Sequence, residues 1–315
     1  MTNPTPNPVS LIGIPLDLGA KNLGVDVGPD AFRYTGIQGK LAGAGLKITD
    51  EGTISVTPRS QLKPGNPRLR FADEIVRVSN EAATLAERLV RHNHRVVGLG
   101  GDHSITLGLA SGISAAVDGE LGMVYLDAHG DMNTSDTTLS GNIHGMHLAS
   151  LMGFGSPELA NVHIPKPKIK PANLLHIGGS DWDQAELDLI HREHLTTFTL
   201  LDLLKSNLAP LFALIDDLAG RVPHIYVSLD LDVIDQIYAP GAGMPNAKGL
   251  TYREIATIAE YIGRTCHVVG VDVVEYNPLQ DDHGKTAELG IELIAKFLGT
   301  NYSWYTNYMA RNQVS

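Results

Sequence analysis

Short apolar runs alternate along the chain with longer segments whose apolar residues recur at helical spacing, and this alternation constrains the fold most. It predicts a parallel sheet with crossover helices packed on both faces. The chain is therefore expected to be an α/β protein with a central, mostly parallel β-sheet. The expected strands are Val9–Pro15, His94–Leu99, Met123–Leu126, Asn173–Ile177, Ile225–Leu229 and His267–Val274, the last four as buried central strands.

Four segments have the apolar periodicity of amphipathic helices, namely Phe71–His92, Leu200–Leu218, Thr251–Ile262 and Thr286–Leu298. The second is expected to break near Pro210, and Pro29 is expected just inside a further helix start, where its missing N–H is harmless. The length of 315 residues fits one large α/β domain or two small ones. Because no linker is long enough to divide the chain, we expect a single domain over residues 1–315, with residues 1–8 as a flexible N-terminal tail.

Charge and cysteine content limit the possible partners. The sequence has 35 acidic against 24 basic residues and no basic cluster interleaved with aromatic residues, which argues against nucleic acid and favours a small cation. The only cysteine, Cys266, excludes an internal disulfide framework or a CxxC metal site, and it fits a reducing compartment. The N-terminus lacks the basic region of a signal peptide, and no apolar run is long enough to span a membrane. We therefore expect a cytoplasmic protein with no membrane partner.

The stretch YLDAHGDMN, residues 125–133, follows an apolar run and places Asp127, His129 and Asp131 at every second position. Alternate positions on a strand share a face, so these side chains are expected to converge. Burial of an isolated carboxylate costs several kcal/mol, so buried charges are normally paired or bound to a metal. The stretch therefore predicts a bound cation.

Acids and a histidine also follow other expected strands. His103 lies in GLGGDHS, Asp230 and Asp232 lie in SLDLDVID, and Glu275 follows the last strand. Ligands bind at the carboxyl ends of strands in open parallel sheets. The glycines of GLGGDHS complete neither GxGxxG nor GxxxxGK[ST], so a nucleotide loop is not indicated. Taken alone, His103 is more often a helix-start or structural residue, and an Asp-x-Asp pair is often a turn or capping device.

Taken together, these four aspartates and two histidines form a ligand set without a thiolate. Such a set suits hard or borderline divalent ions such as Mn²⁺ rather than a structural zinc. Four carboxylates offset the charge of two divalent ions, and such a pair can share a bridging water whose pKa is roughly neutral. The sequence thus predicts a dinuclear site that presents hydroxide for hydrolysis.

The motifs GGDHS, DAHGDMN, SGNIHG, SLDLD and EYNP, with IPLDLGAKNLGVDVGP near the start, resemble the ureohydrolase family, and within it the arginases. The resemblance runs over essentially the whole chain and implies a three-layer α/β fold, two Mn²⁺ ions, and hydrolysis of L-arginine to L-ornithine and urea by a metal-bridging hydroxide. It also implies a homotrimer or homohexamer. The metal ligands it implies are His103, Asp127, His129, Asp131, Asp230 and Asp232; the catalytic residues are His144 for proton transfer, Asp131 as a proton carrier to the departing amine, and Glu275 for orienting the guanidinium.

Substrate choice depends on two further segments. The resemblance implies contacts to the α-carboxylate from NTSDTTLSGN and to the α-amino group from GGSDWDQAE. Agmatine has no carboxylate, so those donors favour arginine, although serine, threonine and asparagine can also merely shape a surface loop. The alternatives are another guanidino substrate, such as agmatine or a guanidino acid, or a non-catalytic regulatory homologue. The implied substrate contacts are Asn133, Thr138, Ser140, Asn142, Asp183 and Glu186.

The chain departs from the family pattern at four positions. Val233 and Gln236 replace residues of a Gly-Leu-Asp-Pro stretch, and Met244 stands where a threonine hydroxyl is expected in the pocket. His147 stands where proline is usual, three residues from His144. All the implied ligands are intact, so these changes bear on turnover and substrate fit more than on reaction type.

Overall fold

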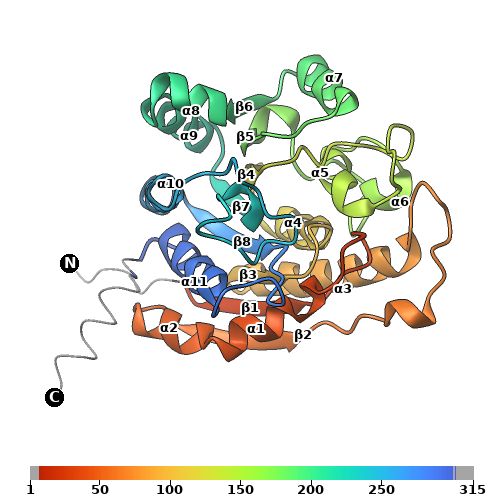
Figure 1. Cartoon of the computed structure of the whole chain (residues 1–315), viewed down its shortest axis with the longest axis horizontal. Coiled ribbons are helices and arrows are strands. Elements are labelled where there is room, and N and C mark those ends of the chain that lie inside the picture. The colour runs from red at the N-terminus through yellow and green to blue at the C-terminus, as the bar shows by residue number, and fades with distance from the viewer. Residues whose placement is uncertain (1–6, 301, 303–315) are drawn as a thin grey trace.

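The strands of the protein form one parallel sheet in this computed structural model, which describes residues 7–300 and 302 (Figure 1). They lie in the order β2-β1-β3-β8-β7-β4-β5-β6, and each neighbouring pair is parallel. The predicted α/β fold, a single domain around a central parallel sheet, is confirmed. The strand bounds are β1 Val9–Ile14, β2 Ile48–Thr53, β3 Arg95–Gly100, β4 Leu121–Asp127, β5 Leu174–Gly178, β6 Thr196–Thr199, β7 His224–Asp230 and β8 Val268–Val274.

Helices cover both faces of the sheet, and each face has its own apolar core. The helix bounds are α1 Gly28–Tyr34, α2 Ile37–Gly43, α3 Ala72–Arg91, α4 Ile105–Ala116, α5 His147–Leu151, α6 Pro157–Ala160, α7 Gln184–Glu193, α8 Leu200–Ser206, α9 Ala209–Arg221, α10 Tyr252–Thr265 and α11 Lys285–Phe297. Buried side chains of α1, α2 and α8 to α11 belong to one core, and those of α3 to α7 belong to the other. The two cores enclose the central strands, as the predicted three-layer arrangement requires.

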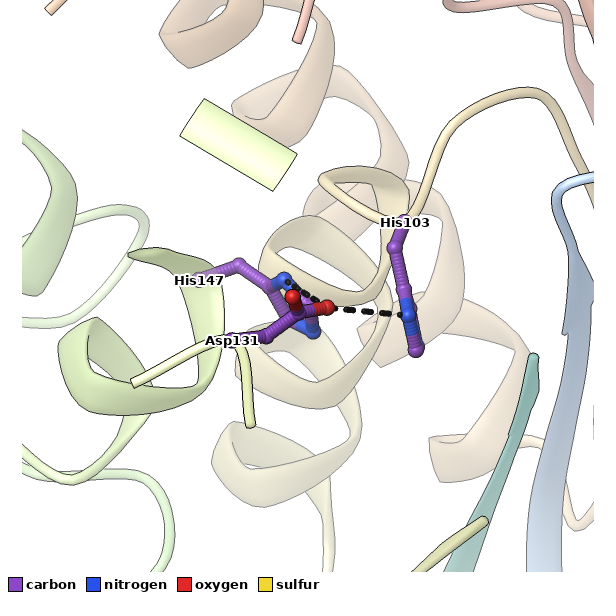
Figure 2. Close-up of side chains that lie close together, drawn as sticks. All are labelled: His103, Asp131 and His147. Atoms are coloured by element: carbon purple, nitrogen blue, oxygen red, sulfur yellow. Dashed lines mark ion pairs between the residues drawn. The ribbon is translucent and has the colours of Figure 1, made fainter. Parts of the chain in front are cut away.

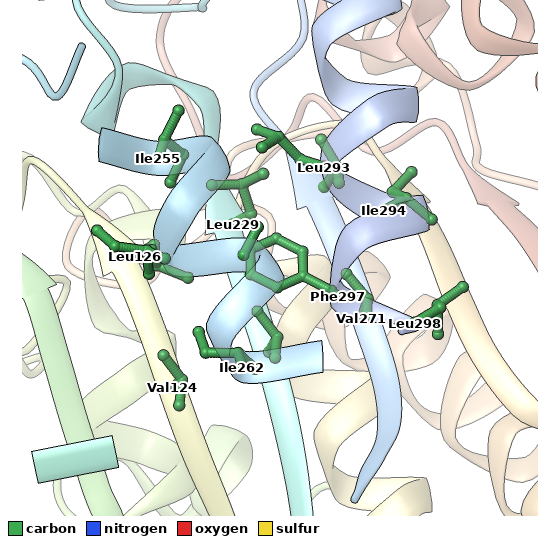
Figure 3. Close-up of a cluster of buried hydrophobic side chains, with 14 of the residues drawn as sticks. Val124, Leu126, Leu229, Ile255, Ile262, Val271, Leu293, Ile294, Phe297 and Leu298 are labelled. Carbon is green, nitrogen blue, oxygen red and sulfur yellow. The ribbon is translucent and has the colours of Figure 1, made fainter. Parts of the chain in front are cut away.

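The central strands are held side by side by the core beneath α10 and α11. Figure 3 shows Leu126, Leu229 and Val271, from β4, β7 and β8, in one cluster with Ile262 of α10 and Phe297 of α11. These five side chains are fully buried. Full burial of such a side chain contributes roughly 1.5 to 3 kcal/mol. This packing gives the strands a rigid base, and their carboxyl ends carry the polar residues described below.

The strand predictions are confirmed inside the sheet and miss its two edges. Each of the six expected strands overlaps β1, β3, β4, β5, β7 or β8. The edge strand β2 has the polar sequence ITDEGT and is largely exposed, and β6 has the short sequence TTFT with one buried residue. Edge strands pair on one side only and tolerate polar side chains. Neither edge therefore has the apolar run on which the predictions relied.

The helix predictions are confirmed for α3, α10 and α11, and the segment around Pro210 divides into α8 and α9. Pro29 lies at the start of α1, as expected. The helix α4 was not expected, because it is buried on nearly all sides and lacks a polar stripe. Its Gly112 packs so closely on α3 that a Cβ there would lie 2.1 Å from the Ala83 carbonyl oxygen. Only glycine permits this approach.

Most of the predicted N-terminal tail, residues 1–6, lies outside the described residues. Of the tail, only residues 7 and 8 are described, and β1 begins directly after them. Among the helices of the described residues, none combines the length and the apolar character that crossing a bilayer requires.

Candidate metal centre

The acidic residues of the predicted site lie at the carboxyl ends of neighbouring strands. Asp127 is the last residue of β4, and Asp230 is the last residue of β7. The parallel register pairs Leu126 with Leu229, so the two aspartates occupy the next position on adjacent strands. His103 lies in the turn between β3 and α4. The sheet thus brings together three motifs that are far apart in the sequence.

His103 is the centre of a first cluster, which we call the His103 position. Its Nδ1 lies 3.0 Å from Asp127 Oδ2, 3.2 Å from Asp131 Oδ2 and 3.3 Å from Asp230 Oδ2. All four residues are buried. One atom of each of His103, Asp127 and Asp230 can therefore bind the same ion.

A second cluster, the His129 position, shares Asp127 with the first. His129 Nδ1 lies 3.4 Å from Asp127 Oδ1 and 3.0 Å from Asp232 Oδ2. Asp127 therefore presents one carboxylate oxygen to each cluster. Asp232 Oδ2 is buried and accepts no hydrogen bond among the described residues, so its contact with His129 Nδ1 is an ion pair only. A buried carboxylate oxygen without a donor indicates a missing cation.

The charges of the two clusters do not balance without added cations. Burial, followed by the neighbouring Asp232 and Asp127, raises the pKa of Asp230 well above its usual value. Burial and Asp127 raise the pKa of Asp232 to about 6. Burial also raises the pKa of Asp127, but contacts with His103 and His129 outweigh it and hold the value well below the usual range. Crowded carboxylates of this kind, with two imidazoles and no thiolate, fit two hard or borderline divalent ions.

Glu275 and His144 lie beside the His103 position. Glu275 Oε1 accepts the His103 backbone N–H at 3.0 Å and lies 3.2 Å from His144 Nδ1. Burial lowers the pKa of His144, but the hydrogen bond and charge of Glu275 outweigh burial and raise it to about 9. Asp131 and Glu275 both have left-handed backbones, with φ of 53° and 59°. Such strain in residues other than glycine concentrates at functional sites.

The chain is similar to known proteins over most of its length. A sequence model of the Arginase family matches residues 7–299. The chain belongs to the arginase family. The arginases of Bacillus caldovelox and Brevibacillus brevis are 35% and 37% identical to it over 294 and 293 residues, which cover 93% and 92% of this chain and 98% and 97% of those proteins. The native structure of the Bacillus caldovelox arginase has a TM-score of 0.90 and covers 94% of this chain and 100% of its own.

Family membership establishes the class of reaction. This arginase-family chain is a hydrolase that acts on the guanidino C–N bond of a small-molecule substrate, and its family is metal-dependent. The fold alone does not select the substrate. The structure of proclavaminate amidino hydrolase from Streptomyces clavuligerus also matches, with a TM-score of 0.72 and 28% identity, covering 94% of this chain and 93% of its own.

In this member of the arginase family, a series of buried hydrogen bonds orients the His103 ring through its Nε2 atom. His103 Nε2 lies 2.9 Å from Ser228 Oγ, which donates to Asp272 Oδ1 at 2.7 Å. Thr106 Oγ1 donates to the other oxygen of Asp272 at 2.7 Å. Because Ser228 donates to Asp272, its oxygen accepts from His103 Nε2, and Nδ1 is left to face the carboxylates or an ion among them. The sequence analysis missed Ser228 and Asp272; both lie on central strands, where period-2 spacing from Asp230 and from Val274 could have indicated them.

Two more side chains that were not predicted as ligands face the His103 position. Tyr125 precedes Asp127 by two residues on β4, and its hydroxyl donates to Asp131 Oδ2 at 2.7 Å. His147 begins α5, and its Nδ1 lies 3.7 Å from the same Asp131 oxygen. Figure 2 shows the Asp131 carboxylate between the rings of His147 and His103. Burial and the neighbouring His103 lower the pKa of His147 to about 3, so the ring is neutral.

The predicted substrate contacts lie outside the buried centre, and the structure brings only two of them together across segments. Asn133 Nδ2 donates to Asp183 Oδ2 at 2.7 Å. Thr138 Oγ1 and Ser140 Oγ accept backbone N–H groups of residues 140 to 142 at 3.0 to 3.3 Å. Asn142 is half-buried and precedes a short 3₁₀ helix without capping it. These hydroxyls thus shape their own loop, as the alternative interpretation of this segment expects.

Asp183 and Glu186 form the capping box of α7. Asp183 accepts the Glu186 N–H at 3.0 Å, and Glu186 accepts the Asp183 N–H at 3.1 Å. Glu186 also accepts the Met132 N–H at 3.1 Å, which joins α7 to the segment that holds Asp131. Burial raises the pKa of Glu186 to about 7. The pair Ser/Thr/Asp-x-x-Glu is a helix-start signature that the sequence analysis did not use at this position.

The loop after Asp232 passes close to Glu275. A Cβ at Gly243 would lie 2.6 Å from Glu275 Oε2, and the Gly243 N–H donates to the Glu275 carbonyl at 2.6 Å. The next residue, Met244, is 37% exposed. The loop therefore reaches the Glu275 carboxylate through backbone and places the Met244 side chain partly in solvent.

Proposed function

We propose that this protein hydrolyses L-arginine to L-ornithine and urea with two Mn²⁺ ions bound at the carboxyl ends of β4 and β7. The observation that supports this most strongly is the pair of buried clusters that share Asp127. Asp232 Oδ2, which accepts no hydrogen bond among the described residues, and the raised pKa of Asp230 support the same conclusion, because both call for added positive charge. The proposed ligands are His103, Asp127, His129, Asp131, Asp230 and Asp232.

The donor set matches manganese in character. Carboxylate oxygen dominates, and imidazole is the only nitrogen donor, a combination that suits Mn²⁺ better than a structural zinc. When bound, the two ions would supply Lewis acidity that makes a water acidic enough to ionise near neutral pH. His129 is the most exposed of these residues, with a side chain 27% accessible, so water and substrate reach the centre from its side.

Glu275 is proposed to bind and orient the guanidinium. Among the described residues, its side-chain hydrogen bonds use Oε1, which leaves Oε2 for a planar cation. His144 is proposed to hold the transferable proton, since Glu275 raises its pKa to about 9 and keeps the ring protonated near neutrality. Asp131, 3.2 Å from His103 Nδ1, is proposed to carry a proton to the departing amine.

The other end of the substrate is proposed to bind at the loop that faces α7. Asn133, Thr138, Ser140 and Asn142 are proposed to donate to the α-carboxylate. Asp183 and Glu186 are proposed to meet the α-amino group, consistent with their charge at the start of α7. The contact between Asn133 and Asp183 supports a common binding surface for both groups. Substrate then has to compete with bonds these side chains already make.

The remaining expectations are also proposals. We propose that residues 1–315 act as one domain, that the protein works in the cytoplasm, and that it assembles as a homotrimer or homohexamer.

Urea release from a panel of guanidines, measured on Mn²⁺-loaded protein, tests the proposed function. The panel contains L-arginine, agmatine and a guanidino acid. Preferred turnover of L-arginine supports the proposal. Preference for another member would reassign the substrate, and no urea from any of them with two ions bound would point to a regulatory homologue.

A further inference from the structure

The Tyr125 hydroxyl lies among the lone pairs of the His103 position. Its oxygen is 2.7 Å from Asp131 Oδ2, 2.8 Å from Asp127 Oδ2, 3.1 Å from His103 Nδ1 and 3.3 Å from His147 Nε2. A phenol has one proton and can satisfy one acceptor at a time. Four converging acceptors around one hydroxyl therefore exceed what hydrogen bonding can satisfy, and a cation would satisfy them together.

His147 presents a lone pair to the same place. Its Nδ1 lies 2.6 Å from the His144 carbonyl oxygen, which can only accept, so Nδ1 carries the proton. In the neutral ring Nε2 is then bare, and it is this atom that faces Tyr125 Oη. The ring is fully buried and its centroid lies 4.4 Å from that of His103. One atom of each of His103, Asp131 and His147 can bind a common ion.

The spacing of these atoms is that of ligands around an ion. In six-coordinate sites with bonds of about 2.1 Å, neighbouring ligand atoms are roughly 3.0 Å apart. The contacts of Tyr125 Oη, at 2.7 to 3.3 Å, and those of His103 Nδ1 with the carboxylates, at 3.0 to 3.3 Å, fall around this value. Tyr125 Oη is therefore placed as a member of the ligand shell.

The His129 position is poorer in donors. Asp127 Oδ1, His129 Nδ1 and Asp232 Oδ2 form its group, to which the described residues add no second histidine. Its histidine is also partly exposed, whereas His103 and His147 are fully buried. Closed shells are typical of structural ions, and open positions of catalytic ones.

We infer that Tyr125 and His147 are two further ligands of the ion at the His103 position, which they largely close, so that this ion has fewer exchangeable positions than the ion at His129. This inference rests on the proposed function for the presence of two ions. With them, the His103 position has six protein donors: His103, Asp127, Asp131, Asp230, Tyr125 and His147. The two positions then differ in affinity and in access to water.

Metal titration of the chelator-stripped full chain tests the assignment. Calorimetry with Mn²⁺ should resolve a tight and a weaker class in the native protein. His147→Ala should weaken the tight class by at least about tenfold, the size found when a residue supporting a metal is lost, and leave the other unchanged. His94→Ala is the control, because His94 contacts Ser10 at the start of β1, at the opposite end of the sheet. Unchanged affinity of both classes in His147→Ala would overturn the role of His147.

Bound iron gives a spectroscopic test of Tyr125 coordination that can be made on the native protein. One equivalent of Fe²⁺, bound to the stripped protein and then oxidised with ferricyanide, should give the visible charge-transfer band of a phenolate on Fe³⁺. Tyr125→Phe should abolish the band. Tyr276→Phe should keep it, because that buried hydroxyl donates to Asp281 at 2.9 Å and not to a proposed ligand. Absence of the band in the native protein would overturn the role of Tyr125.

Water-proton relaxation distinguishes the closed position from the open one. The first equivalent of Mn²⁺ should enhance relaxation little, and the second should enhance it several-fold more per ion. Equal enhancement would show that the first position is open and would overturn the inference. None of these measurements depends on turnover, so absent urea release with both ions bound would remove the proposed function and leave this inference standing.

Discussion

The candidate metal centre and the loop of residues 133–142 are both rich in polar side chains, but these side chains find their partners in opposite ways. In the centre, Asp127 ends β4 and Asp232 lies just beyond the end of β7, and both are buried and present oxygens to His129. In the loop, Thr138 and Ser140 are accessible and accept the backbone N–H groups of residues 141 and 142. The centre is incomplete without added ions, whereas the loop is complete by itself. Polar groups that the protein leaves unsatisfied are thus the better guide to ligand chemistry.

The largest effect is expected from removing the ions. Chelation should abolish urea release, and Mn²⁺ should restore it better than Zn²⁺, because the clusters are built mainly of carboxylates. Metal analysis should find two ions per chain. The helix and strand content should persist throughout, which far-ultraviolet circular dichroism would check. Full activity in stripped protein would contradict the role given to the centre.

A smaller loss is expected from His144→Asn, which keeps the clusters and removes the proton carrier. Turnover should fall on the order of ten- to a thousandfold, the range of general acid–base contributions. Metal content should stay at two ions, since His144 contacts Glu275 and is not a proposed ligand. Steady-state kinetics with metal analysis on the same sample would check both. Unchanged turnover would remove His144 from the mechanism.

The proposed role of the loop in substrate binding is tested by comparing arginine with agmatine. The native protein should prefer arginine over agmatine by about a hundredfold in kcat/KM, because donors built for a charged end are left unpaired by an analogue that lacks it. Asp183→Ala should narrow this gap by removing both the contact to Asn133 and the cap of α7.

Ser156→Ala is a matched control for that variant, since Ser156 caps the short helix α6 instead. It should leave the preference intact. If the two variants narrow the gap equally, the effect of Asp183→Ala comes from lost stability and not from a substrate contact.

Glu186, which joins the two regions, should make stability depend on pH. Its pKa is raised by burial to about 7 in the folded protein, above the usual 4.5. Its stabilising contribution is therefore fully present below about pH 4.5 and is lost as the pH rises through about 7. In the native protein the free energy of unfolding should fall between pH 5 and pH 8, and Glu186→Gln should make this fall smaller by about 1 to 2 kcal/mol. Urea denaturation at both pH values would measure it.

Glu74→Gln is the opposite-signed control. Arg77 is the main cause of the Glu74 pKa lying near 2, lowered from 4.5, so that contribution is present above pH 4.5 and is lost only in acid. Between pH 5 and 8 this variant should keep the slope of the native protein. An equal flattening in both variants would show that the slope does not come from Glu186.

The smallest effect is expected at Met244. Met244→Thr should raise or preserve arginine turnover, with a gain of at most about tenfold, since that is the value of one hydrogen bond to Glu275 or the guanidinium formed in the transition state. Metal content should not change. A melting curve would show whether Met244 instead fills space, in which case the midpoint falls. A clear fall in turnover at unchanged metal content would contradict the expectation.

The clustering of the aspartates and histidines could be predicted because alternate residues of a strand point to the same face. Asp127 and Asp131 were recognised from a period of two after an apolar run, and the pairing of β4 with β7 then brought Asp230 beside them. Tyr125 fits the same period but also fits an apolar strand, so nothing in the sequence distinguished a core tyrosine from one whose hydroxyl meets ligands. His147 stood out only as a departure from the family pattern.

The loop and α7 were less predictable, for a different reason. The same residue types donate to substrates and cap backbones, so Thr138 and Asp183 could be assigned to either role from sequence. The polar edge strands β2 and β6 were missed because pairing on one side leaves little apolar pattern. In an irregular loop the backbone path is not known from the sequence, so the spacing of residues does not predict where their side chains point.

The shared carboxylate of Asp127 has a consequence for how the protein behaves as metal supply changes. Because Asp127 presents one oxygen to each cluster, the affinities of the two ions are expected to depend on each other. Ions that bind only the folded chain stabilise it by about 2.7 kcal/mol at a hundred times their Kd. The melting temperature of this protein should therefore rise with the concentration of free Mn²⁺, and a shortage of manganese would lower its stability as well as its activity.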